Sequence, residues 1–511
     1  MKSKGTVYLV GAGPGDAGLM TMRGAELLGR ADVVVYDALV NPDLLRLAPK
    51  TAEIIYGGKR AKAHAIPQEE LNQLLVSKAR EGKTVVRLKG GDPYIFGRGG
   101  EEAEELADAE ISFEVVPGIS SVVAGPNYAG IPITHRDHCS SFTVVTGHED
   151  PTKPESSLDY EKLARLPGTK VILMGVERIE QIAASLIGHG MPAKTPVGMV
   201  RWGTTGQQQT IEGTLENIAA VAKKQEFSAP AVTIIGDVLK LRAKLNWFEK
   251  RPLFGQRVVV TRTREQASQL SKQLLDLGAE VVEIPTIKIA PPDNLQNVAD
   301  VLLELGTYDW LVFTSPNGVT TFFEYFFKGF EDMRDLGGAR IAAVGPGTAA
   351  KLKELHLKVE LMPEEYVTRK IAEAFAKYET IENLKILLLR AEVANKELPM
   401  ALEEMGAIVD DIACYKTVPE TEDRTQSAAR LLESGADWIT FTSSSTVENF
   451  HARFDLPKLL KQFPKIRLLS IGPETSKAIK VLGLSPAVEA REHNIDGMVK
   501  TLLHETKAKR K

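Results

Sequence analysis

An internal duplication constrains the second half of this chain more than any other feature. Three pairs of similar segments are offset by 128, 128 and 127 residues and begin at 257 and 385, 309 and 437, and 340 and 467. In the second pair, for example, DWLVFTSPNGV is matched by DWITFTSSSTV. Three matches at nearly one offset predict two similar lobes, and short β-branched runs alternating with amphipathic segments make each lobe α/β. A cleft between two such lobes is a common place for a ligand to bind.

The residues before the duplication form a separate part with its own α/β alternation. A chain of 511 residues is long enough for two or three domains. The alternation weakens after Asp237, and a segment containing Pro252 and Gly255 precedes a new strand at Arg257. We therefore predict a first domain at 1–245, a linker at 246–256, a second domain at 257–505 and a basic tail at 506–511.

Periodicity predicts alternating strands and helices in the first domain. Strands are expected at Val7–Val10, Asp32–Tyr36, Thr84–Leu88, Phe113–Val116, Phe142–Thr146, Lys170–Met174, Pro196–Val200 and Ala231–Ile235. Helices are expected at Thr21–Ala31, Pro67–Arg80, Gly100–Ala109, Ile179–Ile187 and Leu215–Lys224.

The composition argues against several classes of protein. A formal net charge of -4 gives no general attraction to nucleic acid or acidic membranes. We find no apolar run long enough to span a membrane, and the first residues lead into a strand rather than a signal peptide. Cys139 and Cys414 are too few for a disulfide framework, and His135 and His138 beside Cys139 match no common zinc spacing. We expect a cytoplasmic protein with no metal, nucleic-acid or membrane partner.

The clearest candidate for a ligand loop is Val85–Glu102, which reads VVRLKGGDPYIFGRGGEE. Five glycines occur in the eleven residues from Gly90 to Gly100, after a β-branched strand and before an acidic helix. Glycine lets the backbone approach a ligand closely, and acidic residues suit the first turn of a helix. We favour a ligand-binding loop over an ordinary strand-to-helix turn.

Similar short motifs follow the other predicted strands. GAGPGD begins at Gly11, but Pro14 and Gly15 stand where the helix of a dinucleotide-binding fingerprint would begin. The other motifs are YDALV at 36–40, GGKR at 57–60, VPGISS at 116–121, LMGV at 173–176 and RWGT at 201–204. Open α/β sheets bind ligands at the carboxyl ends of their strands, so these motifs are predicted to line a common site.

Through these motifs, residues 5 to about 245 resemble the tetrapyrrole methylases, specifically uroporphyrinogen-III C-methyltransferases, which use S-adenosyl-L-methionine. The resemblance implies a two-subdomain α/β fold. It implies cofactor contacts at Pro14, Gly90, Gly91, Asp92, Ile95, Ser120, Ser121, Met174 and Gly203. It also implies a proton acceptor at Asp37 and a proton donor at Lys59. The alternatives are a strand-end turn for Asp37 and a simple anchor for substrate carboxylates at Lys59.

The residue types suit this chemistry. An electron-rich pyrrole carbon is already a nucleophile, so alignment with the methyl donor is the main task of the enzyme. The methylated ring must then lose a proton, which a carboxylate such as Asp37 can accept. The candidate cations for the substrate carboxylates are Arg87, Lys89, Arg98 and Arg136, with an ordinary surface charge as the alternative for each.

Hydroxyl side chains at strand ends are the notable residues of the duplicated half. They are Thr314, Ser315, Thr348, Ser443, Ser444 and Thr475, each at a turn into a predicted helix. Helix capping is the simple interpretation of every one. Helix N-termini around a shared cleft would also suit a polyanionic substrate, so the two interpretations are compatible.

Residues 257 to about 505 resemble uroporphyrinogen-III synthase in the repeat and in VFTSPNGV, AVGPGTA, YKT, FTSSSTV and SIGPETS. The resemblance implies flavodoxin-like lobes that interleave, 257–290 with 417–505 in one and 291–416 in the other. It implies roles for Thr348, Ser443 and Thr475 and assistance by Tyr415 in the loss of hydroxide from the substrate. We add Thr314 and Ser315 as substrate contacts.

Together the two resemblances imply a bifunctional enzyme of tetrapyrrole biosynthesis. It would close hydroxymethylbilane to uroporphyrinogen III with inversion of ring D. It would then methylate C2 and C7 to give precorrin-2 for sirohaem or cobalamin. The alternative is a methylase of a later precorrin joined to a non-catalytic tetrapyrrole-binding module. The methylase resemblance also implies a homodimer formed through the first domain.

Overall fold

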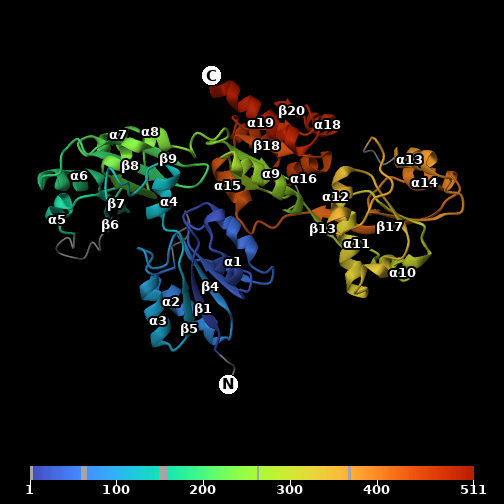
Figure 1. Cartoon of the computed structure of the whole chain (residues 1–511), viewed down its shortest axis with the longest axis horizontal. Coiled ribbons are helices and arrows are strands. Elements are labelled where there is room, and N and C mark those ends of the chain that lie inside the picture. The colour runs from blue at the N-terminus through green and yellow to red at the C-terminus, as the bar shows by residue number, and fades with distance from the viewer. Residues whose placement is uncertain (1–3, 59–65, 149–157, 262–263, 366–369, 511) are drawn as a thin grey trace.

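The structure is a computed structural model that describes residues 4–58, 66–148, 158–261, 264–365 and 370–510. Each of four α/β bodies is built on one five-stranded sheet (Figure 1). We call them the first subdomain, the second subdomain, lobe one and lobe two. The predicted fold class, α/β throughout with a duplicated second half, is confirmed.

The first subdomain has a fully parallel sheet in the order β3-β2-β4-β1-β5. Its strands are β1 (Thr6–Gly11), β2 (Val33–Tyr36), β3 (Glu53–Tyr56), β4 (Val85–Lys89) and β5 (Ser112–Val116). Its helices are η1 (Ala17–Leu19), α1 (Met22–Leu28), η2 (Pro42–Leu47), α2 (Gln68–Arg80) and α3 (Gly99–Asp108). Val7 and Leu9 pack in the cluster formed with α2 and α3, whereas Val10 packs in the one formed with α1. Because all strands are parallel, their carboxyl ends lie at one edge of the sheet.

The second subdomain has a mixed sheet in the order β6-β7-β10-β8-β9. Its strands are β6 (Phe142–Thr146), β7 (Thr169–Leu173), β8 (Pro196–Arg201), β9 (Gln209–Thr214) and β10 (Ala231–Ile235). Its helices are α4 (Ser121–Tyr128), α5 (Tyr160–Arg165), α6 (Ile179–Gly188), α7 (Ile218–Lys224), η3 (Asp237–Leu241) and α8 (Arg242–Leu245).

The predicted linker at 246–256 is packed and is not a loose spacer. The ring of Tyr128 in α4 lies 5.0 Å from that of Trp247 and 4.8 Å from that of Phe248. Leu253 is fully buried in the core of lobe one. This segment therefore joins the cores of the second subdomain and lobe one through apolar contacts.

Lobe one has a parallel sheet in the order β12-β11-β18-β19-β20, a flavodoxin-like order. Its strands are β11 (Arg257–Val260), β12 (Glu280–Glu283), β18 (Trp438–Phe441), β19 (Arg467–Ser470) and β20 (Val488–Glu489). Its helices are α9 (Arg264–Asp276), α15 (Ser427–Ser434), α16 (Ser444–Phe454), α17 (Leu456–Gln462), α18 (Pro473–Val481) and α19 (Ile495–Arg510).

Lobe two repeats this arrangement in the order β13-β17-β16-β14-β15. Its strands are β13 (Ile287–Ala290), β14 (Trp310–Phe313), β15 (Arg340–Ala343), β16 (Lys385–Ala391) and β17 (Ile408–Pro419). Its helices are α10 (Leu295–Leu303), η4 (Leu305–Thr307), α11 (Pro316–Gly329), η5 (Met333–Leu336), α12 (Pro346–Glu354), α13 (Lys370–Tyr378) and α14 (Glu397–Glu404). The run β17-β16-β14-β15 corresponds to β12-β11-β18-β19, as the duplication requires.

Two predicted limits in the second half are wrong. β13 pairs antiparallel with the end of β17, so residues 287–290 and 417–419 belong to the sheet of lobe two and not to lobe one. The expected tail at 506–511 also differs, since α19 continues to Arg510 and Thr506 is buried. The first error arises because the two segments that connect the lobes pair antiparallel with each other. Hydrogen bonds between segments so distant in the chain leave no local pattern in the sequence.

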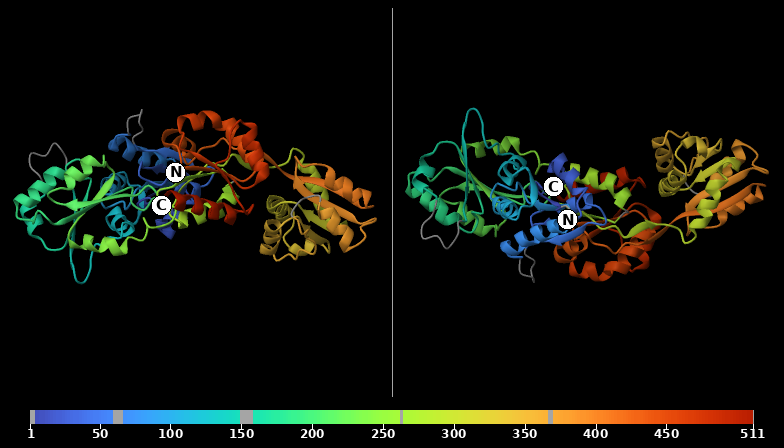
Figure 2. Two further views of the ribbon diagram at one scale, coloured as in Figure 1. Left: turned by 90° about the horizontal axis from the view of Figure 1, so that it is seen from above. Right: turned by 90° about the horizontal axis from the view of Figure 1, so that it is seen from below.

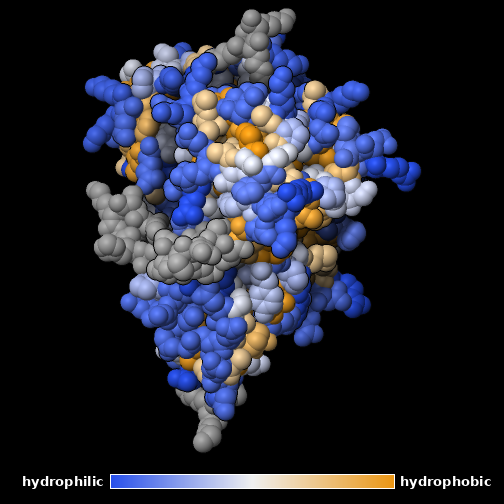
Figure 3. Space-filling view, turned by 90° about the vertical axis from the view of Figure 1, so that its left-hand side faces the viewer, coloured by the Kyte–Doolittle hydropathy of each residue, from blue (hydrophilic) through white to orange (hydrophobic). Residues whose placement is uncertain are grey.

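Lobe one lies between the first domain and lobe two, and lobe two forms one end of the molecule (Figures 1 and 2). Within the described part of the chain, none of the helices combines the length and apolar character needed to cross a membrane. The face at the other end is mostly hydrophilic, with apolar residues scattered in small groups (Figure 3).

Candidate active sites

Three glycine loops of the first subdomain are in direct backbone contact. The amide of Gly91 donates to the carbonyl of Gly13 at 2.8 Å, and Ala12 donates to Lys89 at 2.7 Å. A Cβ on Gly118 would lie 2.1 Å from the carbonyl oxygen of Gly91. The loops after β1, β4 and β5 therefore meet at one edge only because glycine occupies these positions.

Asp92 and Ser120, both predicted cofactor contacts, also stabilise these loops. The Asp92 carboxylate accepts hydrogen bonds from the amides of Tyr94 at 2.8 Å and Gly118 at 3.0 Å. Ser120 caps α4 by accepting from the amide of Val122 at 3.3 Å. Gly91 lies beside this cap, since its added Cβ would be 3.8 Å from the Ser121 nitrogen. A ligand at this edge would contact a framework that is already hydrogen-bonded.

The second subdomain reaches the same edge through the loop after β8. Thr204 accepts a hydrogen bond at its hydroxyl from the amide of Asp16 at 2.9 Å. A Cβ on Gly15 would lie 3.3 Å from the carbonyl oxygen of Gly203. The loops that contain Pro14 and Gly203 therefore meet between the two subdomains.

Two predicted cofactor contacts are exposed apolar residues. Ile95 is 43% exposed and Met174, which follows β7, is 49% exposed. Met174 has a φ of 54°, and Trp202 and Thr204 also have left-handed backbone conformations. Non-glycine residues in this conformation can store strain at functional sites, and the cofactor contact of Met174 stays a prediction.

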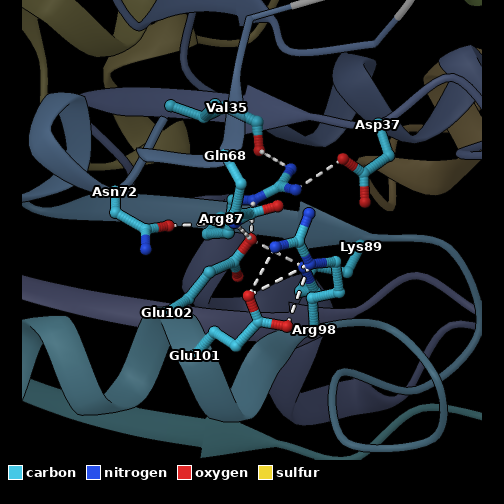
Figure 4. A network of polar contacts seen from close by, with 9 residues as sticks. All are labelled: Val35, Asp37, Gln68, Asn72, Arg87, Lys89, Arg98, Glu101 and Glu102. Carbon is cyan, nitrogen blue, oxygen red and sulfur yellow. Dashed lines mark hydrogen bonds and ion pairs between the residues drawn. The ribbon is translucent and has the colours of Figure 1, made fainter. Parts of the chain in front are cut away.

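Asp37 is anchored by a buried network of charges (Figure 4). Arg87 Nη2 lies 2.5 Å from a carboxylate oxygen of Asp37, and Arg87 Nε donates to Glu102 at 3.0 Å. Lys89 donates to the same Glu102 oxygen at 2.8 Å. Burial lowers the pKa of Lys89, and the nearby Arg87 lowers it further.

This network corrects the expectation for two cations. Arg87 and Lys89 are only 3% and 2% exposed and are bound to carboxylates of the protein, so they are not free to bind substrate. Arg98 is exposed and pairs with Glu101 at 2.5 Å. The role of Glu102 was not predicted, because its position in the helix did not distinguish it from its exposed neighbour Glu101.

The segment after β2 brings Asp37 close to the glycine loops. Asn41 Nδ2 donates to the carbonyl of Gly15 at 2.7 Å. A Cβ on Gly90 would lie 3.1 Å from the Cβ of Leu39. Lys59, the expected proton donor, lies outside the described residues.

In lobe two, Tyr415 and Ser315 lie together. Their hydroxyl oxygens are 2.9 Å apart, and Ser315 also caps α11 by accepting from the amide of Gly318 at 3.0 Å. Tyr415 is 6% exposed, and burial raises the pKa of its hydroxyl. Thr314 precedes Ser315 at the end of β14 and is partly buried.

The remaining predicted hydroxyls lie at helix N-termini, but only one is a cap. Ser443 caps α16 in a capping box with Thr446. Thr348 and Thr475 are each 3% exposed and lie inside the first turns of α12 and α18, whose caps are glycines. The capping interpretation is therefore wrong for these two threonines. It is also wrong for Thr314, which precedes the cap of α11, and for Ser444, which donates to the carbonyl of Glu474 at 3.1 Å.

No group of three or more histidine, cysteine, aspartate or glutamate side chains that could hold a metal ion occurs among the described residues. The absence of a metal from the function stays a prediction.

Two family profiles match successive parts of the chain. Residues 6–219 match the Tetrapyrrole (Corrin/Porphyrin) Methylases, and residues 268–500 match Uroporphyrinogen-III synthase HemD. The first match lies within the first domain and the second match within the second domain.

Individual relatives match either the first part or nearly the whole of the chain. The S-adenosyl-L-methionine-dependent uroporphyrinogen III methyltransferase of Methanosarcina barkeri is 54% identical over 46% of this chain and 93% of its own length. A Thermus thermophilus uroporphyrin-III C-methyl transferase, solved with S-adenyl homocysteine, is 41% identical and covers 46% of this chain and 99% of that chain, with a TM-score of 0.40. The Porphyrin biosynthesis protein HemD of Ruminiclostridium josui is 40% identical over 98% of both chains. This chain therefore belongs to the family of HemD-type porphyrin biosynthesis proteins, with a tetrapyrrole methylase domain followed by a uroporphyrinogen-III synthase domain.

Proposed function

We propose that the chain carries out two consecutive steps of tetrapyrrole biosynthesis. The second domain closes hydroxymethylbilane to uroporphyrinogen III with inversion of ring D. The first domain then uses S-adenosyl-L-methionine to methylate C2 and C7, which gives precorrin-2. The M. barkeri relative, named as a uroporphyrinogen III methyltransferase dependent on this donor, supports the methylation step.

The observation that carries the proposal is the meeting of the Gly11, Gly91 and Gly118 loops beside the segment that begins with Asp37. Backbone carbonyls and small residues suit a sulfonium donor, which a cluster of cations would repel. Asp37 lies at the same edge, where an acceptor ring stacked beside the donor would release its proton.

The donor supplies the methyl group, and the residues of the first domain align the acceptor and handle the proton. The carbon that attacks is nucleophilic, so alignment makes the main contribution to the rate. Asp37 accepts the proton that leaves the methylated carbon, while Arg87 fixes the orientation of its carboxylate. We assign Lys59 as a proton donor or an anchor for substrate carboxylates.

In the second domain, Tyr415 assists the loss of hydroxide from hydroxymethylbilane. Its hydroxyl stays protonated because burial raises its pKa, so it can donate to the departing oxygen. Ser315 holds the phenol in place through the 2.9 Å hydrogen bond. Thr314 and Ser443 contact the carboxylates of the folded substrate at helix N-termini. Thr348 and Thr475, each 3% exposed, support the first turns of α12 and α18, whose backbone amides face the same substrate groups.

The test is to incubate the chain with hydroxymethylbilane, with and without S-adenosyl-L-methionine, and to identify the products. Without the donor, we expect uroporphyrinogen III rather than the isomer I that forms spontaneously. With the donor, we expect the dimethylated product. A product ratio equal to that of spontaneous closure would refute the synthase assignment. Methylation of later precorrins but not of uroporphyrinogen III would refute the assigned acceptor.

A further inference from the structure

The connection between β2 and β3, residues 37–52, is held from outside the first domain. We call it the crossover. It begins with Asp37 and contacts the first glycine loop through Asn41. Lobe one lies beside the first subdomain (Figures 1 and 2), and its residues reach both ends of the crossover.

Most of this contact comes from one turn of lobe one, residues 423–427, which we call the docking turn. Gln426 Nε2 donates to the hydroxyl of Tyr36, the last residue of β2, at 2.6 Å. Arg424 donates to the carbonyls of Pro49 at 2.8 Å and Ala52 at 3.4 Å. The first bond fixes the residue before Asp37, and the others fix the far end of the crossover.

An ion pair secures the middle of the crossover. Arg46 in η2 pairs with Glu283 at the end of β12. Glu283 is only 12% exposed, so the pair is screened less than an ordinary surface pair. Lobe one therefore holds the start, middle and end of the segment that positions Asp37.

Gln426 adopts a strained conformation to make its contact. Its φ of 54° and ψ of 24° lie in the left-handed region, and it stands at the N-cap of α15 without capping the helix through its side chain. The amide of Ala428 in the first turn instead donates to the carboxylate of Asp423 at 3.1 Å. Glycine would adopt this backbone at a lower cost, so the side chain of Gln426 serves the contact with Tyr36 rather than the local fold.

We propose that lobe one is a positioning element of the methyl-transfer site, and that Gln426 and Arg424 are positioning residues for Asp37. Binding couplings are reciprocal, so donor bound in the first domain also stabilises the contact between crossover and docking turn. This inference rests on the proposed methylation of uroporphyrinogen III by the first domain. It predicts that methyl transfer depends on residues more than 370 positions away in the chain.

The decisive variant is Gln426→Gly in the full chain. It removes the bond to Tyr36 but relieves the left-handed backbone, so lobe one should fold normally and keep its synthase rate. We expect kcat for methyl transfer to uroporphyrinogen III to fall about three- to tenfold, which is the effect expected from the loss of one hydrogen bond. KM for S-adenosyl-L-methionine should rise less than kcat falls, because the glycine loops are intact and only the reciprocal coupling to the docking turn is lost.

Two further variants control this measurement. His356→Gly relieves a similar φ of 60° at an exposed residue of lobe two, so its methyl-transfer rate should equal that of the wild type. Gln426→Glu keeps the reach of the side chain and can accept from the hydroxyl of Tyr36. It should therefore restore most of the rate. A wild-type kcat in Gln426→Gly would overturn the inference.

Hydrogen exchange tests this inference independently of the proposed function. S-adenosylhomocysteine should slow amide exchange in residues 37–52 of the wild type, and should slow it less in Gln426→Gly. Equal protection in both proteins would overturn the inference. If the wild-type chain fails to methylate uroporphyrinogen III, the proposed function is wrong, but the exchange comparison still decides whether lobe one positions the crossover.

Discussion

Arg87 Nη2 lies 2.5 Å from a carboxylate oxygen of Asp37, so an arginine on the neighbouring strand β4 anchors the proposed proton acceptor. The Arg87 side chain is 3% exposed and that of Asp37 is 32% exposed. A buried arginine therefore fixes the orientation of the Asp37 carboxylate, which remains accessible to a ligand. A general base needs this combination of fixed geometry and access.

Replacing Arg87 tests how much this network stabilises the first domain. Arg87→Met leaves Asp37 without its arginine and deprives buried Glu102 of one of its cations. We expect the free energy of unfolding to fall by about 3 kcal/mol, as for other broken buried pairs. Arg98→Met is the control, because Arg98 is 57% exposed and its pair with Glu101 should contribute at most about 1 kcal/mol. Denaturant unfolding measures both, and equal losses would contradict the assignment.

The close approach of the glycine loops predicts that Gly118 does not tolerate a side chain. Gly118→Ala would place a Cβ 2.1 Å from the carbonyl oxygen of Gly91, which forces the loops apart. We expect S-adenosylhomocysteine binding, measured by calorimetry, to weaken about tenfold or more. Gly100→Ala is the matched control, since nothing lies within 4 Å of its Cβ in helix α3. If both variants bind alike, the loops do not form the donor site.

Removing the Tyr415 hydroxyl tests the synthase site. Tyr415→Phe loses the bond to Ser315 and the proposed donor to the departing hydroxide. We expect the rate of uroporphyrinogen III formation to fall roughly tenfold, equivalent to one strong hydrogen bond. Tyr308→Phe is the control, because it removes another buried tyrosine hydroxyl of lobe two, which donates to Asp410 at 2.7 Å. An undiminished rate in Tyr415→Phe would exclude the hydroxyl from the mechanism.

The raised pKa of Tyr415 predicts an alkaline loss of stability. Burial favours the neutral phenol, so the pKa in the folded state lies above the unfolded value of about 10. The contribution of this group to stability is complete below that value and is lost as the pH rises through the folded-state pKa. Tyr415→Phe should therefore lose less stability than the wild type between about pH 9 and pH 11. Parallel stability curves for the two proteins would contradict this.

Regular periodic segments were predicted well, and irregular ones were not. The eight strands expected in the first domain are all present, with limits shifted by a residue or so. Helix α4 was missed because Gly125 and Pro126 interrupt its pattern, although packing on β7, β8 and β10 stabilises it. The edge strands β3 and β9 were also missed, because neither shows a regular alternation of buried and exposed residues.

The candidate sites were also predicted only in part: the loops that form them were indicated, but the directions of their side chains were not. The motifs indicated which loops meet, because parallel strands bring their carboxyl ends to one edge whatever the loops contain. They did not indicate that Arg87 and Lys89 point into the core. Nor did they show that glycines rather than Thr348 and Thr475 cap their helices. Which way a side chain points depends on neighbours that are distant in sequence.

The sequence by itself determined the α/β class, the duplication, the glycine loops and both family resemblances, because these depend on local residue types and on spacing along the chain. Only the tertiary structure decided that Arg87 anchors Asp37 and that Ser315 meets Tyr415. It alone showed that Gln426 of lobe one holds the strand before Asp37. These pairs lie 50, 100 and 390 residues apart, and such contacts form only when packing of whole domains offsets the entropy of closing long loops.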